Sequence, residues 1–582
     1  MKTLVSAAVF AVLSSSVVAE TVIYIGGTEY GINEIANNTE TLTSEDLSAL
    51  NAKNLGGVIQ STTSAEVTQT GGPGTLASIF FRGTESDHTT FLINGIRTNE
   101  GFNNSGRVEL LNPLLADEVS IVKGSSSTLF GATIGGVVSI DTNQITPEKL
   151  KGVSKLTVGS DGYNELLVKK AFRGDNSAVS IGAASIETDG IYPTASATEK
   201  GALENQTLDL AFHKNLTFGN LKIQAFHNQG TIGYYSSNVS SPAESDFNTT
   251  AASVTVSDIH HALGKLNIQL SHFVSEYNES IDEGGNGIND HHYTYRTNLD
   301  IQNKLNLNNS LKLSMGLIFT NEDLDADASW TVFKAHTFTK EAFGQLQKTT
   351  ASNDVKLGVR VIDDEHFGNH KTWNASYTQK ITNKMSIGAT SSTGFKTPTG
   401  FERLEPNWGT VNLEPETSRT NEITISFLPN KNIALKHSFY KTKIVDSSNG
   451  TKIDGQELSI EGSINNWEYK STLTIKDPKN HDGSALLKRA KKSASFNAIY
   501  NGKNYRLSNQ VLYNGETIDT YGSGDKKTSS YTLLNTNLDY NLSENITLNT
   551  KIENVFNKDY ETTDGYNTPG QSFYIGLKYT GF

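Results

Sequence analysis

The most regular feature of the chain is an alternation of apolar and polar residues that begins after Gln144 and continues for more than four hundred residues. In the segment 311–319 every second residue is apolar, and the segments 355–361, 423–427 and 505–513 follow the same period. Clusters of Asn, Asp, Gly and Ser separate these segments. Because successive side chains of a strand point to opposite faces, the pattern predicts strands with one apolar and one polar face.

Alternation by itself fits a soluble sandwich or propeller as well as a membrane barrel. At roughly 20 residues for a strand and its connection, the region holds about 22 strands, which can close around a wide lumen. The chain has 22 Tyr and 25 Phe, as the aromatic girdles of a barrel require. It ends on Phe582 after an alternating run that starts at Phe573, and a bulge at Gly581 would bring Phe582 into phase.

The segment from Glu20 to Gln144 has a different pattern and predicts a small α+β domain. Residues 43–46, Thr-Ser-Glu-Asp, are typical of a helix start, with a hydroxyl to cap and acids in the first turn. Short apolar runs at 77–81, 90–93 and 118–122 predict strands. The run Gly-Gly-Pro-Gly at 71–74 predicts a loop.

The first residues predict a secretory signal peptide. Met1 and Lys2 give a short positive start, residues 4–13 are apolar, and Val17-Val18-Ala19 offers small residues for cleavage, so that Glu20 begins the mature chain. A buried N-terminal helix is the alternative. We therefore expect three regions, a signal peptide at 1–19, a first domain at 20–144 and a barrel at 145–582.

Composition narrows the classes of function. The formal net charge is −13 and no basic stripe is present, which argues against a nucleic-acid partner. The mean hydropathy of −0.39 argues against a helical membrane protein but fits a barrel, where only one residue in two needs to be apolar. The absence of cysteine excludes a metal or redox site built on thiolates.

Four ordered blocks between residues 79 and 140 resemble the plug of the TonB-dependent receptors of the outer membrane. Residues 79–83, Ile-Phe-Phe-Arg-Gly, and 91–97, Phe-Leu-Ile-Asn-Gly-Ile-Arg, are similar to that family's I-R-G and I-D-G-V-R motifs, with Asn94 in place of the usual Asp. Residues 118–124 and 130–140 are similar to the closing motif of the plug, with Ser125 in place of the usual Pro.

The barrel region carries two further likenesses to the same family. Residues 394–398, Gly-Phe-Lys-Thr-Pro, and 412–416, Asn-Leu-Glu-Pro-Glu, resemble its F-[KR]-x-P and N-L-x-P-E motifs, and 552–561 resembles its I-x-N-[LV]-F-x-K-x-Y box. The resemblance covers essentially the whole mature chain. It implies an all-β transmembrane barrel of about 22 antiparallel strands, with an α+β plug in its lumen, in the outer membrane and monomeric.

Within the family, the chain looks most like the cobalamin receptors, through residues 68–80, 485–491 and 559–566. The likeness implies a cobalamin or related corrinoid as cargo. Lys488 stands where the motif has Arg, which keeps a donor but loses the planar fork, and Glu85 replaces an Asn. Carried over by position, the cargo contacts are Leu76, Ser78, Glu85, Asn103, Asn104, Lys488 and Tyr521.

The segment next to the predicted cleavage site lies where the family has its TonB box. This segment comprises Glu20, Thr21, Val22, Ile23, Tyr24, Ile25 and Gly26. A short β-prone stretch at a free end can add as a strand to a partner's sheet edge. The resemblance implies that TonB pulls on it from the periplasm; an ordinary plug strand is the alternative.

The sequence predicts no enzyme and no cofactor. No nucleophile-elbow or zinc spacing is present, and the paired histidines at 260–261 and 291–292 would point to opposite faces of a strand. The acids at 189–204 and 233–246 are scattered, which argues against the calcium site of the cobalamin receptors. Arg82 and Arg97, enclosed in a lumen, should face acids on the barrel wall.

Other functions remain open on the sequence alone. A ferric siderophore, or less readily haem, could replace cobalamin as cargo on the same scaffold. A passive porin or an adhesion receptor needs neither a TonB box nor a plug. A barrel lipase or protease would need a catalytic motif, and none is visible.

Overall fold

The structure is a computed structural model that describes residues 22–31, 34, 38–63, 65–235, 242–283, 286–328, 331–404, 413–446, 450–520 and 526–582. The predicted signal peptide lies outside these residues. Among them, no helix is long and apolar enough to cross a membrane.

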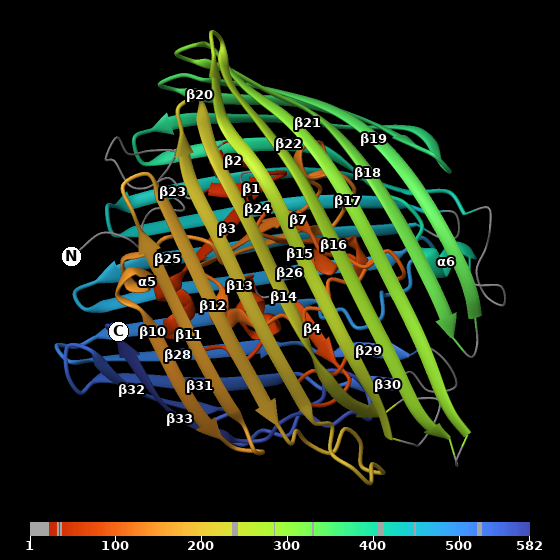
Figure 1. The fold of residues 1–582 in the computed structure, drawn as a ribbon, viewed down its shortest axis with the longest axis vertical. Coiled ribbons are helices and arrows are strands. Elements are labelled where there is room, and N and C mark those ends of the chain that lie inside the picture. The colour runs from red at the N-terminus through yellow and green to blue at the C-terminus, as the bar shows by residue number, and fades with distance from the viewer. Residues whose placement is uncertain are drawn as a thin grey trace.

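The C-terminal region forms one closed antiparallel barrel of 22 strands, as the alternation predicts. Figure 1 shows these strands, coloured from orange through yellow and green to blue, around the red and orange N-terminal segment. The barrel strands are β10 (Val153–Gly159), β11 (Asn164–Arg173), β12 (Ser177–Thr188), β13 (Leu203–Leu216), β14 (Gly219–Tyr235), β15 (Pro242–His261), β16 (Gly264–Glu283), β17 (Asn286–Asn308), β18 (Leu311–Ala328), β19 (Thr331–Thr349), β20 (Asn353–Asp364), β21 (Gly368–Thr382), β22 (Met385–Lys396), β23 (Glu416–Asn430), β24 (Ile433–Val445), β25 (Thr451–Ile464), β26 (Trp467–Asn480), β27 (Lys492–Asn501), β28 (Tyr505–Asn514), β31 (Tyr531–Asn541), β32 (Ile546–Glu553) and β33 (Ser572–Thr580).

Each barrel strand pairs with its neighbour in the sequence, and β10 pairs with β33 to close the sheet. The connecting loops add a two-stranded sheet of β29 (Thr517–Thr520) and β30 (Lys526–Thr528), and a short helix, α6 (Gly400–Leu404). Full closure leaves no sheet edge exposed, which a lipid environment requires because it offers no hydrogen-bond partners.

The apolar face of each strand points outward, and the polar face points into the lumen. In β20 the side chains of Leu357 and Val359 are half exposed, whereas those of Lys356 and Arg360 are buried. A soluble protein buries its apolar face instead, so the reversed orientation distinguishes a transmembrane barrel from a soluble sandwich.

The plug, comprising β1–β9 and α2–α4, lies inside the lumen (Figure 1). Its largest sheet has five strands in the order β3-β8-β9-β6-β7, and two small sheets, β1-β2 and β4-β5, lie beside it. The plug elements and the following helix are β1 (Val22–Ile25), β2 (Thr28–Gly31), β3 (Thr39–Thr43), α2 (Ser44–Leu50), α3 (Leu55–Thr63), β4 (Glu66–Gln69), β5 (Ala77–Phe80), η2 (Phe81–Gly83), η3 (Ser86–His88), β6 (Thr89–Ile93), β7 (Ile96–Arg97), η4 (Pro113–Leu115), β8 (Glu118–Lys123), α4 (Ser127–Phe130), β9 (Gly136–Asp141) and α5 (Pro147–Lys151).

Local sequence explains several plug elements. The Thr43 hydroxyl caps α2 by accepting from the backbone N–H of Asp46, and the Asp46 carboxylate accepts from the backbone N–H of Thr43. The predicted helix start is therefore confirmed. The predicted strands at 77–81, 90–93 and 118–122 correspond to β5, β6 and β8. An apolar core that includes Leu55, Ile79 and Val119 fills the space between the sheet and α3.

The C-terminus differs from the expected bulge. β33 ends at Thr580, and Gly581 leaves the strand with a φ of 127°, a conformation that favours glycine. The ring of Phe582 then stacks on that of Tyr579, with centroids 6.5 Å apart. The last aromatic therefore joins its predecessor on the outer surface by a turn of the chain and not by a shift of register.

Candidate functional site

The two ends of the barrel differ in the length of their connections. Short turns such as 217–218 and 465–466 lie at the end where β10 begins and β33 ends. The long connections lie at the other end, at residues 189–202, 397–415, 481–491 and 554–571. We call these the short-turn end and the long-loop end.

Two plug loops reach the long-loop end. Gly71 and Gly72 lie against Pro193 and Ile191 of the 189–202 loop. The backbone N–H of Gly400 donates to the carbonyl of Gly101 at 3.1 Å. The loops of the plug and of the barrel therefore form one continuous surface at this end.

Glu85 of the plug and Lys488 of the 481–491 loop, both predicted as cargo contacts, lie at this surface. The Glu85 carboxylate lies 2.5 Å from the Arg489 guanidinium, and the Lys488 ammonium lies 3.4 Å from Asp519. Half of the Glu85 side chain and a third of the Lys488 side chain are exposed. Both groups thus keep an open side for a ligand.

Arg489 is a residue of this region that the sequence comparison missed. Its guanidinium donates to the carbonyls of Gly83 and Thr84 and lies 3.8 Å from the centroid of the Phe80 ring. Arg489 follows Lys488 in the motif that carried the resemblance, so the signal was present at a neighbouring position. It ties the 481–491 loop to the plug.

The remaining predicted contacts have different surroundings. Leu76 is half exposed at the tip of the first plug loop, and Ser78 lies in β5 opposite Thr68. Asn103 accepts a bond from the backbone N–H of Ser105. Tyr521 lies outside the described residues.

Asn104 is held within the plug. It is buried, its amide oxygen accepts a bond from Arg97 at 2.9 Å, and its amide nitrogen donates to the carbonyl of Asp87. Its φ of 54° is left-handed, where asparagine is tolerated better than most residues. The side chain therefore shapes the second plug loop.

Below the first plug loop lies a buried carboxyl group that the sequence did not reveal. Glu109 is 6% exposed, and its carboxylate lies 3.6 Å from the guanidinium of Arg107. Arg107 is engaged more closely by Glu100, at 3.0 Å, and lies over the Tyr277 ring. Burial raises the pKa of Glu109 to about 7. Nothing in the local sequence separates this acid from a solvated loop residue.

Residues 22–25 of the segment predicted as a TonB box form β1, which pairs antiparallel with β2 so that Ile23 lies opposite Tyr30. The side chains of Ile23 and Ile25 are buried. Gln302 of the barrel wall donates to the carbonyl of Ile25 at 3.0 Å and accepts from the hydroxyl of Tyr30. Glu20 and Thr21 lie outside the described residues.

A cavity of about 480 Å³ lies between part of this hairpin and the barrel wall. It is lined by Val22 and Tyr24 of β1 and by residues near the short-turn ends of the barrel strands, among them Asn215 of β13 and Asn306 of β17. The hairpin therefore lies beside an opening at the short-turn end.

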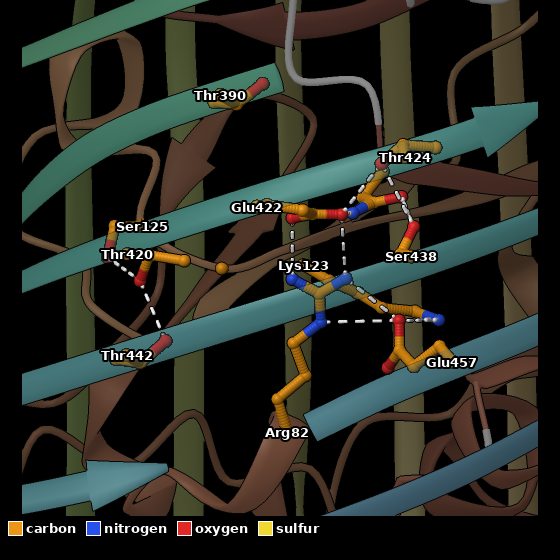
Figure 2. Close-up of polar contacts among 12 residues, drawn as sticks. Arg82, Lys123, Ser125, Thr390, Thr420, Glu422, Thr424, Ser438, Thr442 and Glu457 are labelled. Atoms are coloured by element: carbon orange, nitrogen blue, oxygen red, sulfur yellow. Dashed lines mark hydrogen bonds and ion pairs between the residues drawn. The ribbon is translucent and has the colours of Figure 1, made fainter. Parts of the chain in front are cut away.

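A cluster of charged residues joins the plug to the barrel on the side of β23–β25. Figure 2 shows the Arg82 guanidinium between Glu422 and Glu457, at 2.9 Å from each, with the ammonium of Lys123 beside Glu457. Lys123 also pairs with Glu40 of the plug at 2.7 Å. The expectation that barrel acids face Arg82 is confirmed.

The same expectation is wrong for Arg97. In the part of the chain that the structure describes, its guanidinium forms no ion pair and bonds instead to Asn104. The nearby acids, Glu322 and Glu341, are already paired with barrel arginines. Burial and the charge of Arg296 lower the pKa of Arg97 to about 10.

A second ionic cluster lies at the long-loop end. Carboxylate oxygens of Asp87, Glu402 and Glu416 lie within 4.8 Å of one another. The Lys396 ammonium lies among them, at 2.6 Å from Asp87 and 2.9 Å from Glu416. Because the lysine already supplies the positive charge, the cluster links the plug to the barrel without requiring a metal.

Comparison with known proteins matches both parts of the chain to described families. Residues 32–137 match the profile described as "TonB-dependent Receptor Plug Domain", and residues 155–555 match "TonB dependent receptor-like, beta-barrel". Similar curated proteins carry the name Vitamin B12 transporter BtuB. One from Vibrio vulnificus is 24% identical over 577 residues, covering 94% of this chain and 91% of the relative, and one from Photobacterium profundum is 24% identical over 586 residues, covering 95% and 94%.

Solved structures share the fold at lower identity. A mutant of the ferric enterobactin receptor PfeA from Pseudomonas aeruginosa superposes with a TM-score of 0.80 at 14% identity, covering 94% of this chain and 98% of its own. The siderophore receptor PirA from Acinetobacter baumannii gives the same values. The copper transporter OprC gives a TM-score of 0.78 at 13% identity, covering 91% and 95%. At such identities these likenesses show the fold and leave the ligand open.

Proposed function

Because this chain belongs to the TonB-dependent receptor family of the outer membrane, a family of transporters and receptors, we propose that it imports cobalamin or a related corrinoid by TonB-dependent active transport. In this orientation the long-loop end is extracellular and the short-turn end is periplasmic. We propose that the chain is divided into a signal peptide at 1–19, a plug with its TonB box at 20–144 and a barrel at 145–582.

One observation carries the choice of cargo. The two relatives named above, both vitamin B12 transporters, match over 94% and 95% of this chain. The likeness includes the first plug loop, residues 68–80, whose tip lies at the extracellular end. The siderophore receptors among the solved structures share 14% identity with this chain, against 24% for the two vitamin B12 transporters, so they supply a weaker argument for a siderophore.

The proposed cargo site comprises the exposed groups of the plug and loops at the extracellular end. A corrinoid is broad and fringed with amides, and it needs hydrogen-bonding groups spread over a concave surface. The Glu85 carboxylate can accept from such amides and the Lys488 ammonium can donate to them, and Leu76 offers an apolar contact. Asn104 contributes by holding the second plug loop in shape. Ser78, Asn103 and Tyr521 complete the proposed set.

The proposed mechanism needs an external source of work. An outer membrane holds no ATP and no sustained ion gradient, and the plug fills the lumen. TonB on the periplasmic side would bind the β1 segment by strand addition and pull it. The hairpin lies beside a periplasmic cavity, which supports access from that side. Force on β1 would pass to the plug, while the buried ion pairs of Arg82 resist its release.

Binding of radiolabelled cyanocobalamin to the purified protein tests the cargo. We expect saturable binding that ferric enterobactin does not displace. Lys488→Ala should weaken it about tenfold, the equivalent of one lost charge-assisted hydrogen bond. Lys441→Ala, on the outer surface of β24, is the matched control and should bind normally. Undetectable binding at micromolar cobalamin, with binding of the ferric siderophore, would replace the corrinoid by a siderophore and leave the family assignment unchanged.

A further inference from the structure

The closure of the barrel depends on its two end strands. β10 is 7 residues long and β33 is 9, whereas β16 is 20. Their pairing runs from Val153 with Thr580 to Gly159 with Tyr574. A closed sheet has no free edge, and this short pairing, which we call the seam, is where the first strand of the barrel meets the last.

A single plug residue bonds to both sides of the seam. Asn51, the left-handed C-cap of α2, is buried. Its amide oxygen accepts from Lys155 of β10 at 2.8 Å, and its amide nitrogen donates to Asn549 of β32 at 2.7 Å. Its carbonyl accepts from Lys551 of β32 at 2.7 Å. Since β33 lies between β32 and β10, these bonds span the end strand completely.

Lys53 places its ammonium group at the same seam. Its ammonium lies 3.3 Å from the Glu165 carboxylate of β11. It also lies 5.0 Å and 4.8 Å from the ring centroids of Tyr163 and Tyr574. Tyr163 directly precedes β11 and Tyr574 belongs to β33, so the two rings come from opposite sides of the seam. They meet edge to face at 5.1 Å, and a cation over both faces holds them together.

The groups around Lys53 are fixed by further bonds. Glu165 is 1% exposed and also accepts from Lys155 at 2.9 Å and from the hydroxyl of Tyr163 at 2.8 Å. On the other side, Tyr574 donates to Glu553 at 3.3 Å, and Glu553 pairs with Lys551 at 2.7 Å. Cations and acids from both sides thus form one network, with the plug loop 51–53 between them.

We propose that the plug has a second function besides closing the lumen: its 51–53 loop is a clamp that holds β10 and β33 together. The clamp comprises Asn51 and Lys53. It makes the stability of the barrel depend on the docked plug at the position where the sheet is closed by a short ladder. This inference concerns the barrel wall and is independent of the cargo.

Hydrogen–deuterium exchange of the full chain in lipid bilayers tests the clamp. The variant Asn51→Gly/Lys53→Met removes both side-chain functions, and glycine tolerates the left-handed conformation of residue 51. We expect the amides of β10 and β33 to exchange about tenfold faster than in the unaltered protein, while those of β15 and β16 do not change. The matched control is Glu66→Gln, which breaks a buried ion pair between the plug and Lys476 of β26, away from the seam. It should leave the seam unchanged.

A cross-link provides the second measurement. Leu156 and Leu577 are paired across the seam and face outward, and the chain has no cysteine of its own. A disulfide between Leu156→Cys and Leu577→Cys should return the exchange of the clamp variant to the unaltered rate, or restore its folding if the clamp variant alone does not fold. The proposal is overturned if the clamp variant exchanges normally at the seam, if Glu66→Gln accelerates the seam equally, or if the disulfide restores nothing.

Discussion

Arg82 combines a strained backbone with a buried charge. Its φ of 53° is left-handed, a conformation that costs about 1 kcal/mol or more for a residue with a side chain. Its guanidinium is enclosed between Glu422 and Glu457. The strained backbone is tolerated because it places the guanidinium of Arg82 between the two barrel acids, which stabilise it. Single residues of this kind determine how firmly the plug is docked.

Arg82→Met should loosen the plug. The change leaves Glu422 and Glu457 buried without their main partner, at a cost of about 3–5 kcal/mol to the docked state. Hydrogen exchange of the peptide covering residues 77–85 should accelerate markedly. Lys441→Met, which breaks an ion pair that is more than half exposed, is the control and should change nothing measurable. Equal protection of the plug in both variants would contradict the role given to Arg82.

Glu109 predicts a dependence of stability on pH. Burial raises its pKa from 4.5 to about 7 in the folded protein. Because the pKa is higher in the folded protein than in the unfolded chain, the contribution of Glu109 to the free energy of unfolding is fully present below pH 4.5. It is lost as the pH rises through about 7. Glu109→Gln should therefore remove part of the fall in unfolding temperature between about pH 5 and pH 8. Glu544→Gln, on a periplasmic turn, should show the same fall in unfolding temperature as the unaltered protein. A wild-type pH profile in Glu109→Gln would refute the assignment.

At the scale of elements, the proposed mechanism gives the hairpin β1–β2 two opposing requirements. Its apolar side chains are buried against the lumen wall, which keeps the segment ordered. A strand that is to pair with a partner must leave that position, since Gln302 and β2 occupy its backbone groups. The hairpin is a two-stranded sheet, which is only marginally stable alone, and this suits an element that is to be pulled out.

Tyr24→Pro should separate transport from binding. Proline removes a backbone N–H and disfavours central pairing in a sheet, so strand addition by TonB should fail. Cobalamin binding should stay within about twofold, because β1 lies far from the extracellular loops, and uptake into whole cells should fall to background. Glu29→Gln in β2 should support normal uptake. Uptake that survives the proline would exclude β1 as the segment that TonB grips.

At the scale of the whole molecule, the reversed orientation of the strands decides where charge is tolerated. Outward positions contact lipid, whereas inward positions contact the polar plug or water. Arg360 illustrates the inward environment, since it is 3% exposed and donates to two plug carbonyls, those of Thr128 and Leu129. The plug and the barrel wall thus form one polar interface inside an apolar surface.

Val359→Arg should impair folding into a bilayer. Val359 is half exposed in the outward band of β20, where an arginine near the midplane costs about 2–4 kcal/mol. The folded fraction after dilution from urea into vesicles, measured by the heat-dependent mobility shift of the folded barrel on gels, should fall. Leu263→Arg, on a periplasmic turn, should have little effect because the cost falls to about 0–1 kcal/mol near the interface. Equal folding of the two variants would argue against the membrane placement.

The predicted cargo contacts stay predictions, and the structure shows only where each of the described ones lies. Glu85 and Lys488 were found through motifs, and both lie at the extracellular end with open sides. Arg489 and Glu109 were missed. Arg489 lies in the same motif as Lys488, but its partners in the plug are remote in the chain, and the burial of Glu109 leaves no local pattern. Arg97 was assigned the wrong kind of partner because the acids near it are used by Arg296 and Arg360.

The sequence by itself determined the class of the fold. A period of two along the strands, the change of pattern near Gln144 and the spacing of turns are local properties, and a local property can be read from neighbouring residues. Tertiary structure alone decided which face of each strand meets lipid, which acids meet Arg82, and how the 51–53 loop spans the seam. Those outcomes depend on distance in space between residues remote in the chain, and ring closure of the sheet fixes these distances only when all strands are in place.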